Sequence, residues 1–150
     1  MTTNIISRAE FGDIPDIKRI EEECGLSPWS VGAYEMELKL PGSLILKAQA
    51  GEGTIAGFVV GRARDGGEAE ILNIGTALRF QRRGIGSKLI EEFRAICAER
   101  RVSVIWLEVR STNHSAIDFY KSHGFIKKGV RPKFYSNPTE DADLMALALT

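Results

Sequence analysis

The feature that most constrains the fold is a set of three apolar runs separated only by short glycine-containing turns. The runs are Ser43–Ala50, Thr54–Arg64 and Glu68–Thr76. Because tight glycine turns join neighbouring antiparallel strands, these runs predict a three-stranded meander. The segment Gly84–Arg101 follows, and its apolar residues recur at helical spacing, which predicts an amphipathic helix.

Further strands and helices are expected on both sides of the meander. Before it we expect a strand at Asn4–Arg8 and helices at Asp13–Gly25 and Ser30–Leu40, with Glu21–Glu23 facing water. After the long helix we expect the strand Val102–Val109, the helix Asn113–His123 and the strands Phe125–Val130 and Leu144–Leu149. The strongly apolar run Val102–Val109 is typical of a strand buried on both faces. The order β-α-α-β-β-β-α-β-α-β-β predicts an α/β fold with a mixed sheet and helices on both faces.

Length and charge narrow the class of protein. The 150 residues correspond to one domain, 1–150, and the 20 Lys and Arg balance the 20 Asp and Glu. A net charge of +0 argues against binding nucleic acid or an anionic membrane through bulk electrostatics. The sequence has no signal-like apolar start and no run near the roughly 18 apolar residues of a membrane span. We therefore expect a cytoplasmic protein that contacts neither nucleic acid nor membrane directly.

The cysteines and histidines do not form a recognisable metal site. Cys24 and Cys97 lie far apart in the sequence and are expected to be reduced thiols. His114 and His123 have no partners at zinc-ligand spacing, and we expect both on the surface of the last helix, with no assigned role. The sequence therefore predicts no metal and no covalent acyl-enzyme on a cysteine.

The chemical signal is the turn Gln81-Arg82-Arg83-Gly84-Ile85-Gly86, which lies between a strand and a helix. Glycines allow close approach of a ligand, and the free N–H groups of a helix N-terminus attract anions, so a phosphate or pyrophosphate is the expected ligand. The turn matches neither a Walker loop nor a Rossmann fingerprint. A helix start that merely contains glycine is the alternative.

The pattern Q-x-x-G-x-G at this position resembles motif A of the GNAT acetyltransferases, in which the turn holds the pyrophosphate of acetyl-CoA. The resemblance runs from about Asn4 to Leu149. The runs Glu68–Ile74, Trp106–Asn113 and Phe119-Tyr120 are similar to those of the RimI-type protein N-terminal acetyltransferases. The expected fold is therefore the GNAT acyltransferase fold, and the expected cosubstrate is acetyl-CoA.

The resemblance implies a set of acetyl-CoA contacts. A bulged strand edge would bind the pantetheine and polarise the thioester oxygen, the turn would hold the pyrophosphate, and the start of the last helix would contact the CoA arm. The implied residues are Ile74, Gly75, Thr76, Gln81, Arg82, Arg83, Gly84, Ile85, Gly86, Ser87 and Asn113. Asn113 can also cap the helix that it precedes, and both roles are compatible.

Glu108 and Tyr120 are the candidate catalytic residues. A carboxylate in an apolar run costs free energy unless it is paired, so Glu108 is either an ion-pair partner of Arg110 or another arginine, or a general base with a raised pKa. The resemblance implies the general base. Tyr120 is either a core aromatic or, as the resemblance implies, the residue that donates a proton to the departing CoA thiolate or stabilises it by a hydrogen bond.

The resemblance also implies the acceptor side. Trp29, Arg131 and Tyr135 are the candidate acceptor contacts. The implied reaction is direct acetyl transfer from acetyl-CoA to a protein α-amine, by resemblance the N-terminal alanine of small-subunit ribosomal protein eighteen. The alternatives are a small-molecule amine or lysine acceptor, and a catalytically silent acetyl-CoA-binding module. The oligomeric state does not follow from the sequence.

Overall fold

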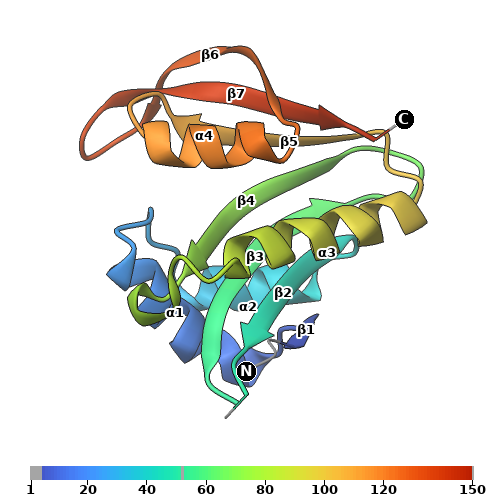
Figure 1. Ribbon diagram of the computed structural model, residues 1–150, viewed down its shortest axis with the longest axis vertical. Helices are drawn as coiled ribbons and strands as arrows, with labels where there is room; N and C mark the ends of the chain where they lie inside the picture. Colours follow the sequence, from blue (N-terminus) through green and yellow to red (C-terminus); the bar gives the residue numbers. More distant parts are fainter. Residues whose placement is uncertain (1–4, 52, 150) are drawn as a thin grey trace.

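The computed structural model describes residues 5–51 and 53–149, and these form a mixed sheet with helices on both faces (Figure 1). The strands are β1 (Ile5–Arg8), β2 (Ser43–Gln49), β3 (Ile55–Ala63), β4 (Ala69–Thr76), β5 (Val104–Arg110), β6 (Ile126–Tyr135) and β7 (Glu140–Ala148). The helices are α1 (Ile14–Glu23), α2 (Val31–Lys39), α3 (Ile85–Glu99) and α4 (His114–Ser122), with short 3₁₀ turns at Phe11–Asp13 and Leu78–Phe80. The predicted order of strands and α-helices is confirmed, and the predicted strand residue Asn4 lies outside the described residues.

The strand order β1-β2-β3-β4-β5-β7-β6 places β7 between β5 and β6. Neighbouring strands are antiparallel except β4 and β5, which are parallel, so the predicted mixed sheet is confirmed. The β4–β5 pairing covers only Ala69–Ile71 against Ile105–Leu107. Beyond Ile71 the two strands diverge, and the β5–β7–β6 group with α4 stands apart from β1–β4 (Figure 1).

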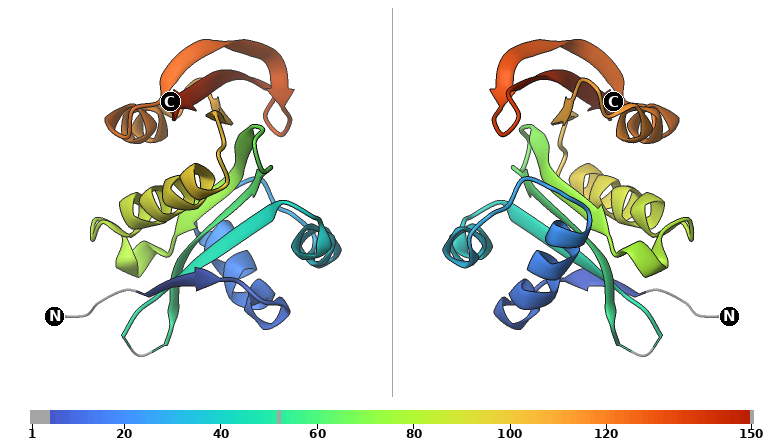
Figure 2. Two further views of the ribbon diagram at one scale, coloured as in Figure 1. Left: turned by 90° about the vertical axis from the view of Figure 1, so that its right-hand side faces the viewer. Right: turned by 90° about the vertical axis from the view of Figure 1, so that its left-hand side faces the viewer.

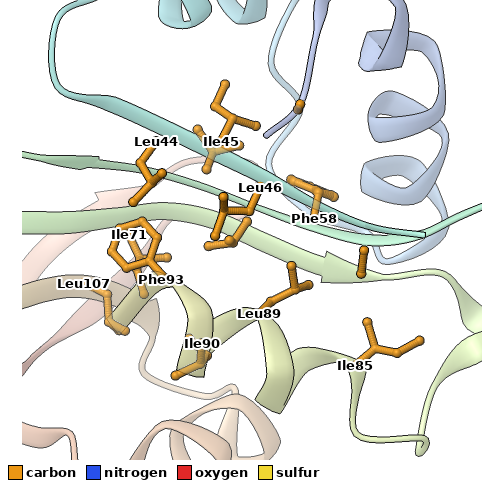
Figure 3. Close-up of a cluster of buried hydrophobic side chains, with 14 of the residues drawn as sticks. Leu44, Ile45, Leu46, Phe58, Ile71, Ile85, Leu89, Ile90, Phe93 and Leu107 are labelled. Carbon is orange, nitrogen blue, oxygen red and sulfur yellow. The ribbon is translucent and has the colours of Figure 1, made fainter. Parts of the chain in front are cut away.

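Helices α3 and α4 cover one face of the sheet, and α1 and α2 cover the other (Figure 2). The buried side of α3 packs Leu89 and Phe93 onto the central strands (Figure 3). Gly61 on β3 makes room for this packing, because a Cβ at this position would lie 2.5 Å from the Phe93 ring. Apolar burial of this kind is the main favourable term that holds the helices to the sheet.

Local signals explain the ends of α1 and α2. Pro15 stands in the first turn of α1, where its missing N–H costs nothing, and Gly25 beyond the end of the helix adopts φ +64°. The Ser30 hydroxyl accepts a hydrogen bond from the Ala33 amide at 3.0 Å and caps α2. One prediction for α1 was wrong: Glu21 is only 2% exposed, whereas its neighbours Glu22 and Glu23 face water as expected.

The predictions for the last strands need two corrections. The strand β5 is not buried on both faces: Ile105, Leu107 and Val109 are buried, while the residues between them remain partly exposed. The strands β6 and β7 are also longer than predicted, because register shifts around Gly129 and Pro132 interrupt the alternation on which a sequence-based boundary depends.

Candidate active site

A cavity of about 760 Å³ opens at the carboxyl end of β4, beyond its short pairing with β5. Its wall includes most of the residues that the sequence singled out. They come from the α1–α2 loop, β4, the turn Gln81–Gly86 (called the glycine turn below), β5, α4 and the end of β6. These are Trp29, Ile74, Gly75, Thr76, Gln81, Arg82, Gly84, Ile85, Gly86, Ser87, Glu108, Asn113, Tyr120 and Tyr135. Arg83 and Arg131 are not part of this wall. Because the strands separate here, groups from both faces of the sheet reach one cavity.

The turn Gln81–Gly86 leads into the free N-terminal amides of α3. Arg82 and Gly84 adopt φ +64° and +78°, and Gly84 is the N-cap of α3. The Lys88 amide donates to the Gly84 carbonyl at 3.0 Å, which leaves the first-turn amides before it without a partner inside the helix. Arg83 instead lies over the Phe80 ring, with its guanidinium carbon 5.5 Å from the ring centre. The turn is therefore suited to a phosphate group, through its backbone and through Arg82 rather than Arg83.

The end of β4 is held by two side chains. The Gln81 amide group and the Cys24 thiol each donate a hydrogen bond to the Thr76 carbonyl, both at 3.1 Å. Cys24 therefore lines the cavity, which the sequence did not predict, and burial raises the pKa of its thiol. A thiol that is harder to ionise is a poor nucleophile, so its position does not suggest an acyl-enzyme.

The expected bulge at Ile74–Thr76 is displaced along β4. The register shift falls where Val60 pairs with Asn73 and Gly61 with Ile71, so the extra residue is Leu72. Bulges increase local twist, and this one directly follows the last residue paired with β5. Gly75 is closely packed, because a Cβ there would lie 3.0 Å from the Leu26 side chain.

Glu108 lies on the partly exposed face of β5, and of the two roles weighed from the sequence the ion pair is observed, while the general base stays a prediction. Its partner is Arg131 on β6, with 3.6 Å between Arg131 Nε and Glu108 Oε2, rather than Arg110. Burial raises the pKa of the Glu108 carboxyl, Arg131 lowers this pKa, and the carboxylate of Glu70 raises it. The net upward direction favours a group that can accept a proton near neutral pH.

Tyr120 reaches the cavity from α4, on the opposite face of the sheet from Glu108. Burial raises the pKa of its hydroxyl, which therefore remains a proton donor. Asn113 begins the same helix, and its side-chain oxygen accepts a hydrogen bond from the Ala116 amide at 3.2 Å. The capping role of Asn113 is thus confirmed, and the cap fixes where α4 starts relative to the cavity.

The acceptor-side aromatics lie on separate elements. The Tyr135 ring is covered by the Arg110 guanidinium at 4.3 Å, and burial together with Glu108 raises the pKa of its hydroxyl to about 12. Trp29 stacks on Tyr34, with 5.0 Å between ring centres. Arg131 pairs with Glu108 and does not itself line the cavity, so its role as an acceptor contact stays a prediction.

Sequence reasoning missed a polar bridge between α3 and the end of α4. His123 Nε2 lies 3.0 Å from the Ser87 hydroxyl, and its Nδ1 lies 3.0 Å from a Glu91 carboxylate oxygen. The side chain of His123 is only 13% exposed, so the expected surface position was wrong for this residue. No spacing rule links His123 to Ser87, because the contact depends on how α3 and α4 pack.

The fold and cavity match a known class of enzymes. The model of the acetyltransferase (GNAT) family matches residues 14–125, most of the chain. The chain belongs to the GNAT family of acetyltransferases, as its motifs predicted. No helix among residues 5–51 and 53–149 is long and apolar enough to cross a membrane.

One relative and two solved structures show which acetyltransferases of this family the chain is similar to. The ribosomal protein bS18-alanine N-acetyltransferase of Escherichia coli strain K12 is 33% identical over 150 residues, which cover 98% of this chain and 99% of that protein. The crystal structure of the ribosomal-protein-S18-alanine N-acetyltransferase from Escherichia coli matches with a TM-score of 0.88 and 31% identity, over 99% of this chain and 95% of that chain. Chaetomium thermophilum Naa20 in complex with a bisubstrate analogue matches with a TM-score of 0.85 and 26% identity, over 96% and 86% of the two chains.

Proposed function

We propose that the protein transfers the acetyl group of acetyl-CoA to the N-terminal alanine of ribosomal protein bS18. The observation that carries the proposal is that Glu108 and Tyr120 reach one cavity from opposite faces of the divided sheet, next to an anion-binding turn. The relatives named for this reaction, matched over nearly the whole chain, support the choice of acceptor.

The residues of the cavity fit acetyl-CoA. The N-terminal amides of α3 and the turn around Gly84 suit a pyrophosphate, since both present N–H donors and no competing carboxylate lines that part of the wall. The diverging strand β4 leaves the backbone of Ile74–Thr76 without a β5 partner. The Ile74 amide bonds to Asn73 Oδ1 and the Thr76 carbonyl accepts from Gln81 and Cys24, so the remaining polar groups of this stretch are the ones available to the pantetheine arm. A cavity of about 760 Å³ is of the size that accommodates small-molecule ligands.

Glu108 and Tyr120 then have complementary proton-transfer roles. Glu108 accepts a proton from the acceptor amine, directly or through one water, and the amine nitrogen bonds to the acetyl carbon. As the carbon–sulfur bond breaks, the Tyr120 hydroxyl gives its proton to the departing sulfur, and CoA leaves as a thiol. The nitrogen loses its second proton as the amide forms, this proton restores Tyr120 through solvent, and Glu108 releases the first proton to solvent. The raised pKa of Glu108 makes it a stronger base. Tyr120 is protonated at neutral pH, so its hydroxyl can hydrogen-bond to the departing sulfur and give it a proton as negative charge develops there.

An α-amine is a suitable acceptor for this base. Its reference pKa of about 7.7–8.0 is far below the roughly 10.4 of a lysine side chain, so a modest base suffices to deprotonate it. The aromatic residues Trp29 and Tyr135 line the same cavity as Glu108. They offer apolar contact area to the first residues of a peptide.

The test is acetyl transfer from labelled acetyl-CoA to short peptides. The peptides vary the first residue, carry a free or a blocked α-amine, and include one with an internal lysine. Mass spectrometry then locates the acetyl group. We expect acetylation of free N-termini, best with alanine, whereas acetylation of lysine alone, or of no peptide despite binding of acetyl-CoA, would overturn the proposal.

A further inference from the structure

A buried polar cluster lies beneath the loop between α1 and α2, outside the reacting groups considered so far. Its centre is Glu21, whose carboxylate is almost completely buried. One oxygen, Oε1, accepts a hydrogen bond from Lys18 Nζ at 3.1 Å. The other, Oε2, accepts from the Tyr34 hydroxyl at 2.6 Å and from the Trp29 amide at 3.1 Å. Three donors thus converge on one carboxylate.

The cluster fixes Trp29 at three points. The Trp29 amide donates to Glu21, and the Trp29 carbonyl accepts from Lys18, so both polar atoms of its backbone are held. Its ring stacks on Tyr34, whose hydroxyl is itself bonded to Glu21. Each of these contacts depends on the Glu21 carboxylate directly or through one neighbour.

The same loop is anchored to β4. The Leu26 amide donates to the backbone carbonyl of Glu21 at 3.0 Å. The Leu26 side chain packs against Gly75, because a Cβ added to Gly75 would lie 3.0 Å from it. Leu26, Trp29 and Gly75 all line the cavity. The cluster therefore sets the distance between the acceptor-side loop and the strand beside the expected thioester position.

Burying a carboxylate is costly, and an apolar residue of similar size would often stabilise a fold equally well. What the carboxylate adds here is one defined geometry, because the donors from α1, α2 and the loop between them must all reach the same group. We propose that Glu21 is a positioning residue that sets the affinity for the acceptor by holding Trp29 in the cavity wall. This inference rests on the proposed function, in which Trp29 contacts the acceptor peptide.

The substitution Glu21→Gln tests this geometry with little change in volume. A glutamine places an NH₂ group, which only donates, where one carboxylate oxygen accepted a hydrogen bond. Because the Lys18 ammonium and the Trp29 amide are donors as well, one of them must lose its partner. The loop then loses its single defined position, while α3 and the glycine turn stay unchanged.

Glu37 provides a matched control. Its carboxylate is 3% exposed and accepts two hydrogen bonds from Arg62, at 2.9 and 2.7 Å, on α2 and away from the cavity wall. Glu37→Gln therefore also removes a buried, fully paired carboxylate. Any effect that follows from loss of stability alone will be present in both variants.

The experiment combines kinetics with fluorescence. Michaelis constants are measured for an alanine-led peptide and for acetyl-CoA, in the wild type, Glu21→Gln, Glu37→Gln and the milder Tyr34→Phe. Trp106→Phe is added to each protein for the optical measurement, so that Trp29 is the remaining tryptophan and its emission and quenching by acrylamide report on the loop.

We expect Glu21→Gln to raise the KM for the peptide about tenfold, with an unchanged KM for acetyl-CoA and a red-shifted, more readily quenched Trp29. Tyr34→Phe should change both properties in the same direction but less, and it serves if Glu21→Gln does not fold. Equal peptide KM values and equal Trp29 emission in Glu21→Gln and Glu37→Gln would overturn the inference. If wild-type protein acetylates no peptide, the proposed function fails, and the fluorescence comparison still decides whether Glu21 holds the loop.

Discussion

Replacing Arg131 by methionine should change the pH dependence of acetyl transfer rather than its maximum. Arg131 is the cation beside the candidate base, with 3.6 Å between Arg131 Nε and Glu108 Oε2. It lowers the pKa of Glu108, so its removal raises that pKa. The reactive form is the carboxylate. As the pH is lowered, the variant must therefore begin to lose activity at a higher pH than the wild type does.

The magnitude follows from the distance and the exposure of the pair. Two unit charges 3.6 Å apart interact by about 1 kcal/mol in a water-like medium. The value for water applies because the Arg131 side chain is 56% exposed, although that of Glu108 is only 20% exposed. Below the titration of Glu108 the variant should be about fivefold slower than the wild type, and the difference should vanish at high pH.

The assay is the ratio of kcat/KM for variant and wild type on one alanine-led peptide, from about pH 5 to about pH 9. The α-amine of the peptide titrates identically in both measurements and cancels in the ratio. Lys128→Met on the same strand is the control and should show a flat ratio. A ratio for Arg131→Met that is below one but constant with pH would refute the electrostatic role and would instead indicate a direct contact with the acceptor.

Three further substitutions test the site and the fold. Glu108→Gln should reduce kcat/KM at neutral pH by about 10²–10⁴-fold while the Kd for acetyl-CoA, measured by calorimetry, stays unchanged; retained turnover would exclude the general base. Tyr120→Phe should lower kcat by about 10²-fold with an unchanged peptide KM, and a higher kcat with a substrate whose thiol leaves more easily would support its role as acid. Gly61→Ala should lower stability by about 1–3 kcal/mol, seen in chemical denaturation, because the new methyl group would meet the Phe93 ring at 2.5 Å; an unchanged midpoint would show that the core adjusts.

The order of strands and helices was predictable because their signals are local. Pro15 and Gly25 delimit α1, Ser30 caps α2, and the spacing of apolar residues identifies α3. The ends of β6 and β7 were not predictable. Register shifts around Gly129 and Pro132 remove the alternation that marks a strand, and Lys133 adopts φ +52°, so only the pairing of the flanking residues with β7 identifies this stretch as part of β6.

In the candidate site too, some residues could be predicted from the sequence and others could not. The glycine turn and Glu108 stand out in the sequence, because glycines at a helix start and a carboxylate in an apolar run break local rules. Glu21 does not stand out, since it occupies one of three consecutive glutamates and only the return of the α1–α2 loop buries it. Likewise, the pairing of Arg131 with Glu108 arises from the placement of β7 between their two strands.

Because β4 and β5 pair over so short a stretch, ligand binding in the cavity should also affect the stability of the folded protein. Three residue pairs join the two parts of the sheet there, and the cavity wall beyond them is drawn from both parts. A bound molecule that contacts both parts of the sheet adds interactions between them. Its binding free energy therefore adds to the free energy of unfolding. At 100 times its Kd such a ligand adds about 2.7 kcal/mol to the free energy of unfolding. The concentration of acetyl-CoA would then affect the resistance of the protein to heat and to proteolysis, in addition to its rate of turnover.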